Sequence, residues 1–248
     1  DDPSALFDDG PGGELIAEMN ALERRLLLAR LVRTWKETLN QQSLRLLAGE
    51  ELILPASSAD ALYLAQDLCG FLDEAVNEEA GLHGLGALAP DRLAEWWQLT
   101  LTFLQILTDQ WPAILKERGL EDRSAARVRW FDAEAERLRR LKPKTPIIVA
   151  GTTATAPSTV RFLAAVANLP AGALVLPGVD CHLDEPSFRA IDVAQSIAAP
   201  GHPQHVMRRI LGGLLFDRES VTSLAPDEGD PLLARERFLS DAMRPAET

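Results

Sequence analysis

The sequence has few of the residues that build several common kinds of site. It holds only two cysteines, Cys69 and Cys181, among 248 residues. Two widely separated cysteines do not make a disulfide scaffold, and they indicate a reducing compartment. No CxxC pair is present, so neither a zinc site nor an iron–sulfur cluster is expected within this sequence. We therefore expect no bound metal and a cytoplasmic location.

Long apolar runs are also missing. No stretch approaches the roughly 18 residues that cross a membrane, and no signal peptide is visible. We expect no association with a membrane. Residues 1–4 and 244–248 look like cuts within a longer protein, and residues 1–13, rich in proline, glycine and aspartate, are expected to be a linker or a poorly ordered terminus.

Positive charge is scarce as well. The 25 Lys and Arg residues are outnumbered by 37 Asp and Glu, which gives a net charge of −12. A dedicated nucleic-acid-binding domain is normally basic, so this balance argues against one. Residues 122–144 depart from it with a local excess of Lys and Arg, which fits either a solvated helix face or a surface that follows phosphates. The basic residues there are Arg123, Arg127, Arg129, Arg137, Arg139, Arg140, Lys142 and Lys144.

The first part of the chain, residues 14–143, has the apolar periodicity of helices. Over residues 14–42 apolar side chains recur at steps of three and four, so they share one face of a long helix, with arginines opposite. Ser57 takes the N-cap position of a second helix, with an acidic residue in its first turn. Cys69 lies on the apolar face of that helix and is expected to be a small core residue.

A third helix is predicted over residues 91–118, kinked or broken by Pro112 and closed by Gly119. Its tryptophans stand at helical spacing, and core packing is their expected role. Two other roles stay open: stacking on nucleic-acid bases, or docking a partner protein through residues 91–111. The tryptophans of this third helix are Trp96, Trp97 and Trp111.

A fourth helix is predicted over residues 121–141, and it carries most of the basic segment.

The second part, residues 144–248, changes character. It begins with an apolar strand at 146–150, a loop of small residues, a helix at 158–169 and a second strand at 173–177. This order is the β-loop-α-β unit that builds parallel sheets. Ligands usually bind at the carboxyl ends of such strands. The expected fold class is therefore α/β and helix-rich, with a partial parallel sheet and a large helical portion.

The loop after the first strand decides which chemistry this unit supports. A phosphate-binding loop needs several glycines and a lysine, whereas this loop has Gly151 alone and no lysine. An NTPase would carry magnesium-binding acids after the strand, where Ala150 and Gly151 stand. Hydroxyls and a helix N-terminus remain, so a nucleotide or sugar phosphate at residues 151–155 stays an alternative. The loop residues concerned are Ala150, Gly151, Thr152, Thr153 and Thr155.

A polar loop follows the second strand. It holds Asp180, His182, Asp184 and Glu185, which are metal-binding or acid–base residues by type. Nothing in their spacing matches a known site. We therefore expect neither a metal site nor a catalytic residue in this sequence.

The segment with the sequence IIVAGTTATAPS, residues 147–158, closely resembles the AddB family in its proteobacterial form. These are double-strand break repair proteins that partner the AddA helicase–nuclease. The similarity extends over nearly the whole chain. The other segments that carry it are residues 23–31, 111–112, 163–167, 169–180, 202–204 and 242–246.

The resemblance implies a fragment of a larger ATP-dependent helicase–nuclease subunit. AddB-like proteins have an N-terminal region folded like a superfamily 1 helicase without a working motor. A C-terminal nuclease domain, outside this sequence, would hold the iron–sulfur cluster and magnesium. This chain would be part of the helicase-like region, with an inactivated P-loop-NTPase-like sheet. Its implied role is non-catalytic scaffolding of DNA and of an AddA-type subunit in recombination and repair, with the basic residues of 122–144 as DNA contacts.

Overall fold

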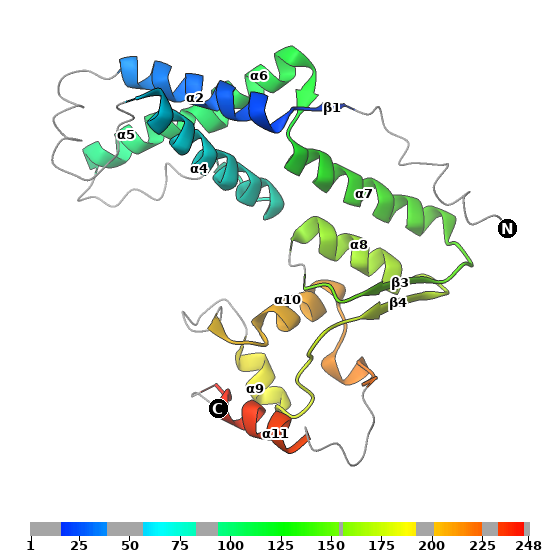
Figure 1. Cartoon of the computed structure of the whole chain (residues 1–248). Helices are drawn as coiled ribbons and strands as arrows, with labels where there is room; N and C mark the ends of the chain where they lie inside the picture. Colours follow the sequence, from blue (N-terminus) through cyan, green and yellow to red (C-terminus); the bar gives the residue numbers. More distant parts are fainter. Residues whose placement is uncertain are drawn as a thin grey trace. The chain divides into compact units, whose positions relative to one another are not determined.

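A computed structural model of the chain describes residues 16–38, 57–82, 94–153, 156–191, 201–224 and 233–245. The chain forms two compact units, which we call the N-terminal unit (Gly13–Trp130) and the C-terminal unit (Phe131–Thr248). The division falls within one helix, α7 (Arg123–Leu141), upstream of the boundary expected at residue 143. Within the described residues, helices dominate and two small parallel sheets accompany them, so the helix-rich α/β class is confirmed (Figure 1).

The N-terminal unit is built from helices and one short parallel strand pair, β1 with β2. Helix α2 packs against α4, and the buried apolar side chains of both helices share one core with the segment around Trp111. Its elements are β1 (Ala17–Glu18), α2 (Ala21–Thr38), α4 (Ser58–Asn77), α5 (Ala94–Gln105), the π-helix Ile106–Gln110, α6 (Trp111–Arg118) and β2 (Leu120–Glu121).

The first helix starts later than residue 14, where its periodicity placed it. Residues 17–18 pair with β2 instead, and the Met19 N–H donates to the Glu121 carbonyl at 2.9 Å, so the chain is extended up to Ala21. The expected end at residue 42 lies outside the described residues. The expected apolar face is also partly wrong, because Leu22 and Leu26 are 63% and 51% exposed.

Sequence signals at the ends of the next helices are confirmed. The Ser57 hydroxyl accepts from the Asp60 N–H at 3.2 Å, and the Asp60 carboxylate accepts from the Ser57 N–H at 2.8 Å. This reciprocal capping box starts α4. Pro112 follows a five-residue π-helix that interrupts the third helix, and Gly119 ends α6 with a φ of 63°. Cys69 is half-buried against the core, and burial raises the pKa of its thiol.

The C-terminal unit is organised around the β-loop-α-β unit that the sequence predicts. Strand β3 pairs in parallel with β4, in a register that places Ile147 beside Gly172 and Ala150 beside Val175. Buried side chains of α7 and α8 pack together, including Ala135 and Val166. Its elements after α7 are β3 (Ile147–Ala150), α8 (Pro157–Ala167), β4 (Gly172–Val175), α9 (Glu185–Ala190), α10 (His205–Leu214), a 3-10 turn (Arg218–Ser220) and α11 (Leu233–Ala242).

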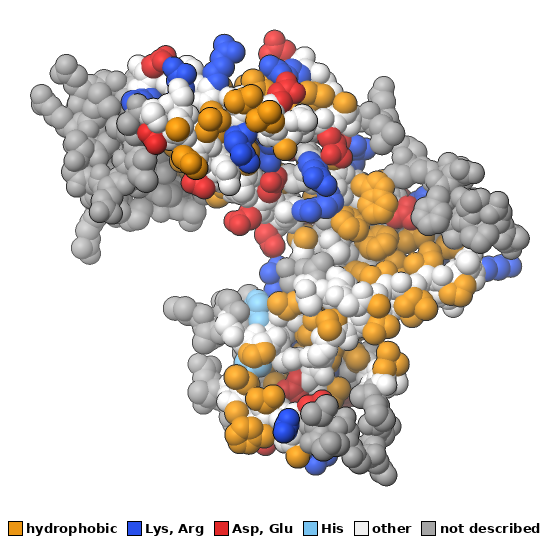
Figure 2. All heavy atoms as spheres, in the orientation of Figure 1, with side chains coloured by type: hydrophobic (Ala, Val, Ile, Leu, Met, Phe, Trp, Pro, Cys, Tyr) orange, Lys and Arg blue, Asp and Glu red, His pale blue; other side chains and the backbone are white. Residues whose placement is uncertain are grey.

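The described sheet of this unit has two different faces. Ile147, Val149 and Leu174 pack into clusters with residues of α8. On the neighbouring position of β3, Ile148 is 65% exposed. Hydrophobic side chains are visible over this unit in Figure 2, along the strands and around α11. Gly172 starts β4 where the chain passes very close to α8, because a Cβ at this position would lie 1.8 Å from the Val166 carbonyl oxygen.

Candidate functional site

The loop after β3 is described at residues 151–153 and 156. Ala150 and Gly151 stand exposed at the carboxyl end of the strand. Gly151 has a φ of 72°, and its N–H donates to the Val175 carbonyl at 3.0 Å, which completes the strand pair before the chain turns away. A φ of this sign favours glycine at position 151. Of the threonines that follow, Thr152 is half-buried and Thr153 is exposed, whereas Thr155 lies outside the described residues.

Helix α8 begins directly after this loop. Its N-cap residue, Ala156, makes no side-chain cap, and Pro157 occupies the first turn. Ser158 is buried, at 2% exposure. Among the described residues 150–153 and 156–158, no side chain carries a carboxylate or an amine. The loop can therefore offer N–H groups and hydroxyls to a ligand, and those residues supply nothing that binds magnesium or activates a water.

Half of the eight basic residues of 122–144 are engaged within the protein. Arg129 pairs with Glu121, and this hydrogen bond raises the pKa of the Arg129 guanidinium. Arg127 donates to the Asn77 side-chain oxygen at 2.6 Å. The Glu121 carboxylate offsets the charge of Arg129, whereas the neutral Asn77 only occupies a donor of Arg127.

Arg137 and Arg139 are engaged through the acids of their own helix. The Arg137 guanidinium lies 2.6 Å from Glu134, and the residue is 8% exposed, so the expectation that it contacts DNA is not compatible with its burial. The Arg139 guanidinium lies 3.5 Å from Glu136. Helical spacing of three places each acid beside its arginine.

The remaining basic residues are solvent-exposed, and three of them cluster where α7 ends. Arg140, Lys142 and Lys144 have no ionic partner among the described residues. Lys142 has a φ of 45°, and its N–H donates to the Leu138 carbonyl at 2.9 Å, which closes the helix. Arg123 is exposed at the opposite end of α7. We call Arg140, Lys142 and Lys144 the basic end of α7.

The chain matches no protein-family model, no curated protein and no solved structure. In the described part of the chain, no helix is both long and apolar enough to span a membrane.

The acids of the polar loop after β4 have structural partners. Asp180 Oδ1 accepts from the N–H groups of His182 and Leu183, at 2.8 and 3.0 Å. Asp184 caps α9 by accepting from the Ser187 N–H at 2.8 Å, a hydrogen bond that lowers the pKa of Asp184. The searched, described residues contain no group of three or more potential metal ligands.

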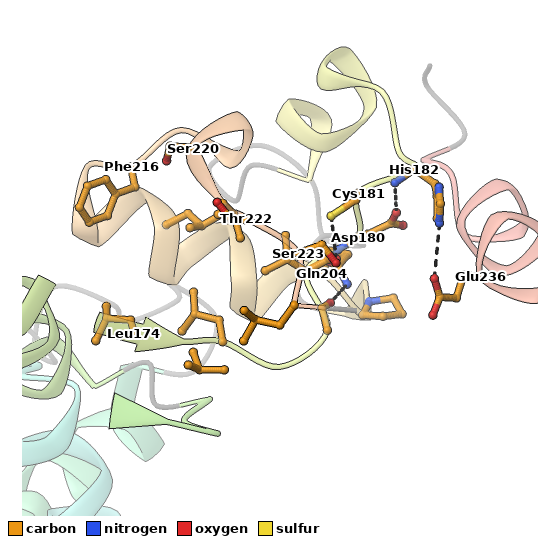
Figure 3. Close-up of a pocket in the computed structure, with 18 of the residues that line it drawn as sticks. Leu174, Asp180, Cys181, His182, Gln204, Phe216, Ser220, Thr222, Ser223 and Glu236 are labelled. Carbon is orange, nitrogen blue, oxygen red and sulfur yellow. Dashed lines mark hydrogen bonds and ion pairs between the residues drawn. The ribbon is translucent and has the colours of Figure 1, made fainter. Parts of the chain in front are cut away.

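The sequence did not predict a pocket of about 1310 Å³ in the C-terminal unit, although Asp180 and His182, which it singled out by residue type, both line this pocket. The pocket runs along β4 and the loop that follows it, and Figure 3 shows side chains that line it. The described residues of the β3–α8 loop, 151–153 and 156, are not among the lining residues. A second local signal is at α11, where Leu233, Glu236 and Ser240, and Met243 just after the helix, recur at helical spacing.

Proposed function

We propose that this chain is a non-catalytic, helicase-like module of a DNA double-strand break repair and recombination complex. In this proposal it holds DNA and contacts an AddA-type helicase–nuclease subunit. One observation carries the proposal. The β3–α8–β4 unit has strand, helix and parallel strand in the order that nucleotide-binding units use, and Ala150 and Gly151 end the strand where an active motor would need acids. A site that keeps its form without the chemistry is compatible with scaffolding.

The basic end of α7 is the DNA contact in this proposal. Arg140, Lys142 and Lys144 are exposed and close in sequence, so they offer three positive charges to a phosphate backbone. This set is smaller than the eight residues expected from the sequence, because Arg137 is buried and Arg129 is paired with an acid. Phosphate contacts of this kind fix a protein on DNA without reading its sequence.

Charge reversal at the basic end of α7 tests this proposal. Fluorescence anisotropy with a labelled duplex carrying a single-stranded tail should show binding that weakens as salt rises. The triple variant Arg140→Glu, Lys142→Glu, Lys144→Glu should bind at least about tenfold more weakly at low salt and lose about two to three units of salt slope. Binding that does not depend on salt would contradict the proposal, as would the absence of binding.

A matched control separates the basic end of α7 from overall charge. Arg25, Arg30 and Arg33 of α2 are exposed and have no ionic partner among the described residues. Reversing these three changes the net charge by the same amount. DNA affinity should then fall much less than in the α7 variant, because the altered charges lie outside the proposed contact. Equal losses in both variants would show that only bulk charge matters.

The start of α8 has no side-chain cap, so its N–H groups could bind a nucleotide or sugar phosphate, which is the second candidate function. Calorimetry with ATP and with glucose 6-phosphate should show no heat of binding if the unit is purely architectural. Binding that is abolished by Thr153→Glu, which adds a negative charge to an exposed position of the loop, would instead support a nucleotide or sugar-phosphate site. Hydrolysis of ATP by the chain would also contradict the non-catalytic role.

A further inference from the structure

The pocket of the C-terminal unit exposes apolar side chains to solvent. Four of its lining residues are large and hydrophobic yet open: Phe216 is 40% exposed, Leu224 78%, Leu239 56% and Met243 49%. Leu174 and Leu176 belong to the same lining. Ligand pockets are lined mainly by hydrophobic side chains with a few placed polar groups. The apolar part of this pocket therefore fits the apolar body of a small molecule.

Among the described lining residues of the pocket, the Asp, Glu, Lys and Arg side chains are all of one sign. Its described lining includes the carboxylates of Asp180 and Glu236 and no lysine or arginine. Arg218 is close by, but its guanidinium donates to the Asp180 carbonyl at 3.0 Å and lies 3.5 Å from Glu185 Oε2. The other ionisable lining residues are Cys181, His182 and His202. This arrangement disfavours phosphates and carboxylates and favours a cation.

The two carboxylates come from different elements. Asp180 belongs to the loop after β4 and Glu236 to α11, and Figure 3 shows His182 next to Glu236 at one side of the pocket. The His182 Nε2 atom lies 3.5 Å from Glu236 Oε2. Asp180 uses Oδ1 for two backbone N–H groups and has no described partner at Oδ2. Each carboxylate thus keeps an oxygen available for a donor.

Ser240 gives an independent indication of a missing partner. The residue lines the pocket and is 5% exposed. Its hydroxyl oxygen is buried and has no hydrogen-bond partner among the described residues. A buried polar group without a partner is unfavourable, so native structures rarely leave one. Ser240 follows Glu236 by four residues, which places both side chains on the same face of α11.

We propose that this pocket binds an amphipathic organic cation. The apolar body of the ligand covers Phe216, Leu239 and Met243. Its protonated amine donates to the carboxylates of Asp180 and Glu236 and to the unpaired hydroxyl of Ser240. This binding site goes beyond the scaffolding role and does not depend on it.

Three probes of equal chain length test the charge preference. Octylammonium, octanoate and octyl glucoside are titrated into the chain by calorimetry below their micelle concentrations. Octylammonium should bind, and octanoate should bind at least about tenfold more weakly because it meets like charge. Equal binding of the anionic or the uncharged probe would overturn the proposed cation site, as would no detectable binding of octylammonium.

Two variants and a control locate the site. Glu236→Gln and Ser240→Ala should each weaken octylammonium binding several-fold. Glu219→Gln removes the same charge from an exposed position outside the pocket lining and should leave binding unchanged. Equal losses in Glu236→Gln and Glu219→Gln would overturn the site.

Methyl NMR provides a readout that does not depend on any substitution. The chain contains three methionines. Met243 lines the pocket, whereas Met207 is buried outside the lining and Met19 belongs to the N-terminal unit. With methyl-labelled methionine, octylammonium should shift the Met243 signal selectively. Binding that leaves Met243 unmoved would place the ligand elsewhere and refute the proposal.

Discussion

Replacing Arg24 with methionine should destabilise the N-terminal unit by about 3 kcal/mol at neutral pH. Arg24 is only 8% exposed, and its Nε atom lies 2.8 Å from Asp122 Oδ1. A second guanidinium nitrogen donates to Asp73 Oδ2 at 3.0 Å. Asp122 is 4% exposed and also accepts from the Trp111 Nε1–H at 2.7 Å. Arg24 therefore offsets the negative charge of the buried Asp122 carboxylate. The contacts of these two residues connect α2 with Asp73 of α4 and with Trp111 of α6.

The magnitude follows from what the substitution leaves behind. Methionine fills most of the space of the arginine, so the cavity contribution is small. Asp122 remains buried with only the Trp111 hydrogen bond, and breaking a buried pair by removing one partner costs about 3 to 5 kcal/mol. We expect the lower end of this range, about 3 kcal/mol, because the Asp122 carboxyl can take up a proton. Protonation of its carboxyl removes the uncompensated charge.

The sign of the pH dependence is fixed by the same carboxyl. Burial raises the pKa of Asp122 above its ordinary value, although the Trp111 hydrogen bond and the Arg24 charge act in the opposite direction. A raised pKa means that the folded state holds the proton more strongly than the unfolded state. The stability that protonated Asp122 contributes is present at low pH and is lost as pH rises through the folded-state pKa. Without Arg24 this loss should grow.

Urea unfolding followed by tryptophan fluorescence measures the effect. The destabilisation by Arg24→Met should be larger at pH 7 than at pH 4.5. The double variant Arg24→Met, Asp122→Asn should recover most of the lost stability, because asparagine keeps an acceptor for Trp111 and carries no charge. A cost below about 1 kcal/mol, or an equal cost at both pH values, would refute the reasoning. So would a double variant that is no more stable than the single one.

Three further substitutions have expected effects on thermal or urea unfolding. Ser57→Ala removes half of the capping box with Asp60 and should cost about 1 kcal/mol; no loss would mean that the box is not formed in solution. Gly172→Ala places a Cβ 1.8 Å from the Val166 carbonyl oxygen and should cost at least about 2 kcal/mol, whereas an unchanged midpoint would contradict this close approach. Gly212→Ala has open space inside α10 and should stabilise by up to about 1 kcal/mol; destabilisation would argue against a helical environment at this position.

Local patterns predicted a large part of the fold. Strand, helix and strand appear in the C-terminal unit at nearly the residues expected, and β3 pairs with β4 in parallel. Ser57 and Gly119 mark the ends of helices as expected. These features depend on residues that are neighbours in sequence, such as a cap and the first turn that it caps. Neighbouring residues are what a sequence pattern displays directly.

Burial of charged residues could not be predicted in the same way. Helical periodicity puts Arg24 among the arginines opposite the apolar face of residues 14–42, because the sequence gives no sign of its partners, Asp73 and Asp122, which are distant along the chain. Its burial also moves the apolar face of α2 away from Leu22 and Leu26. Arg137 lies beside Glu134, but spacing alone does not tell an exposed pair from a buried one.

Sequence patterns also could not predict that residues from several distant segments line one pocket. Its lining comes from the region of β4, the turn before α10, the last turn of α10, the segment around Phe216 and α11. The described part of the loop at Gly151, which looked most like a ligand site, contributes none of it. The expected packing of Trp96 and Trp97 concerns side chains outside the described residues, whereas Trp111 is buried, at 1% exposure, as expected for core.

The π-helix before α6 has a consequence for comparing this chain with relatives. In Ile106–Gln110 the turn is wide enough for the Trp111 N–H to donate to the Ile106 carbonyl, five residues back. The wide turn relieves the clash that the Pro112 ring would make with the Thr108 carbonyl in a regular helix. A homologue with one residue fewer here could keep both flanking helices in place. Its alignment would show a single gap, and the proline should be missing with it.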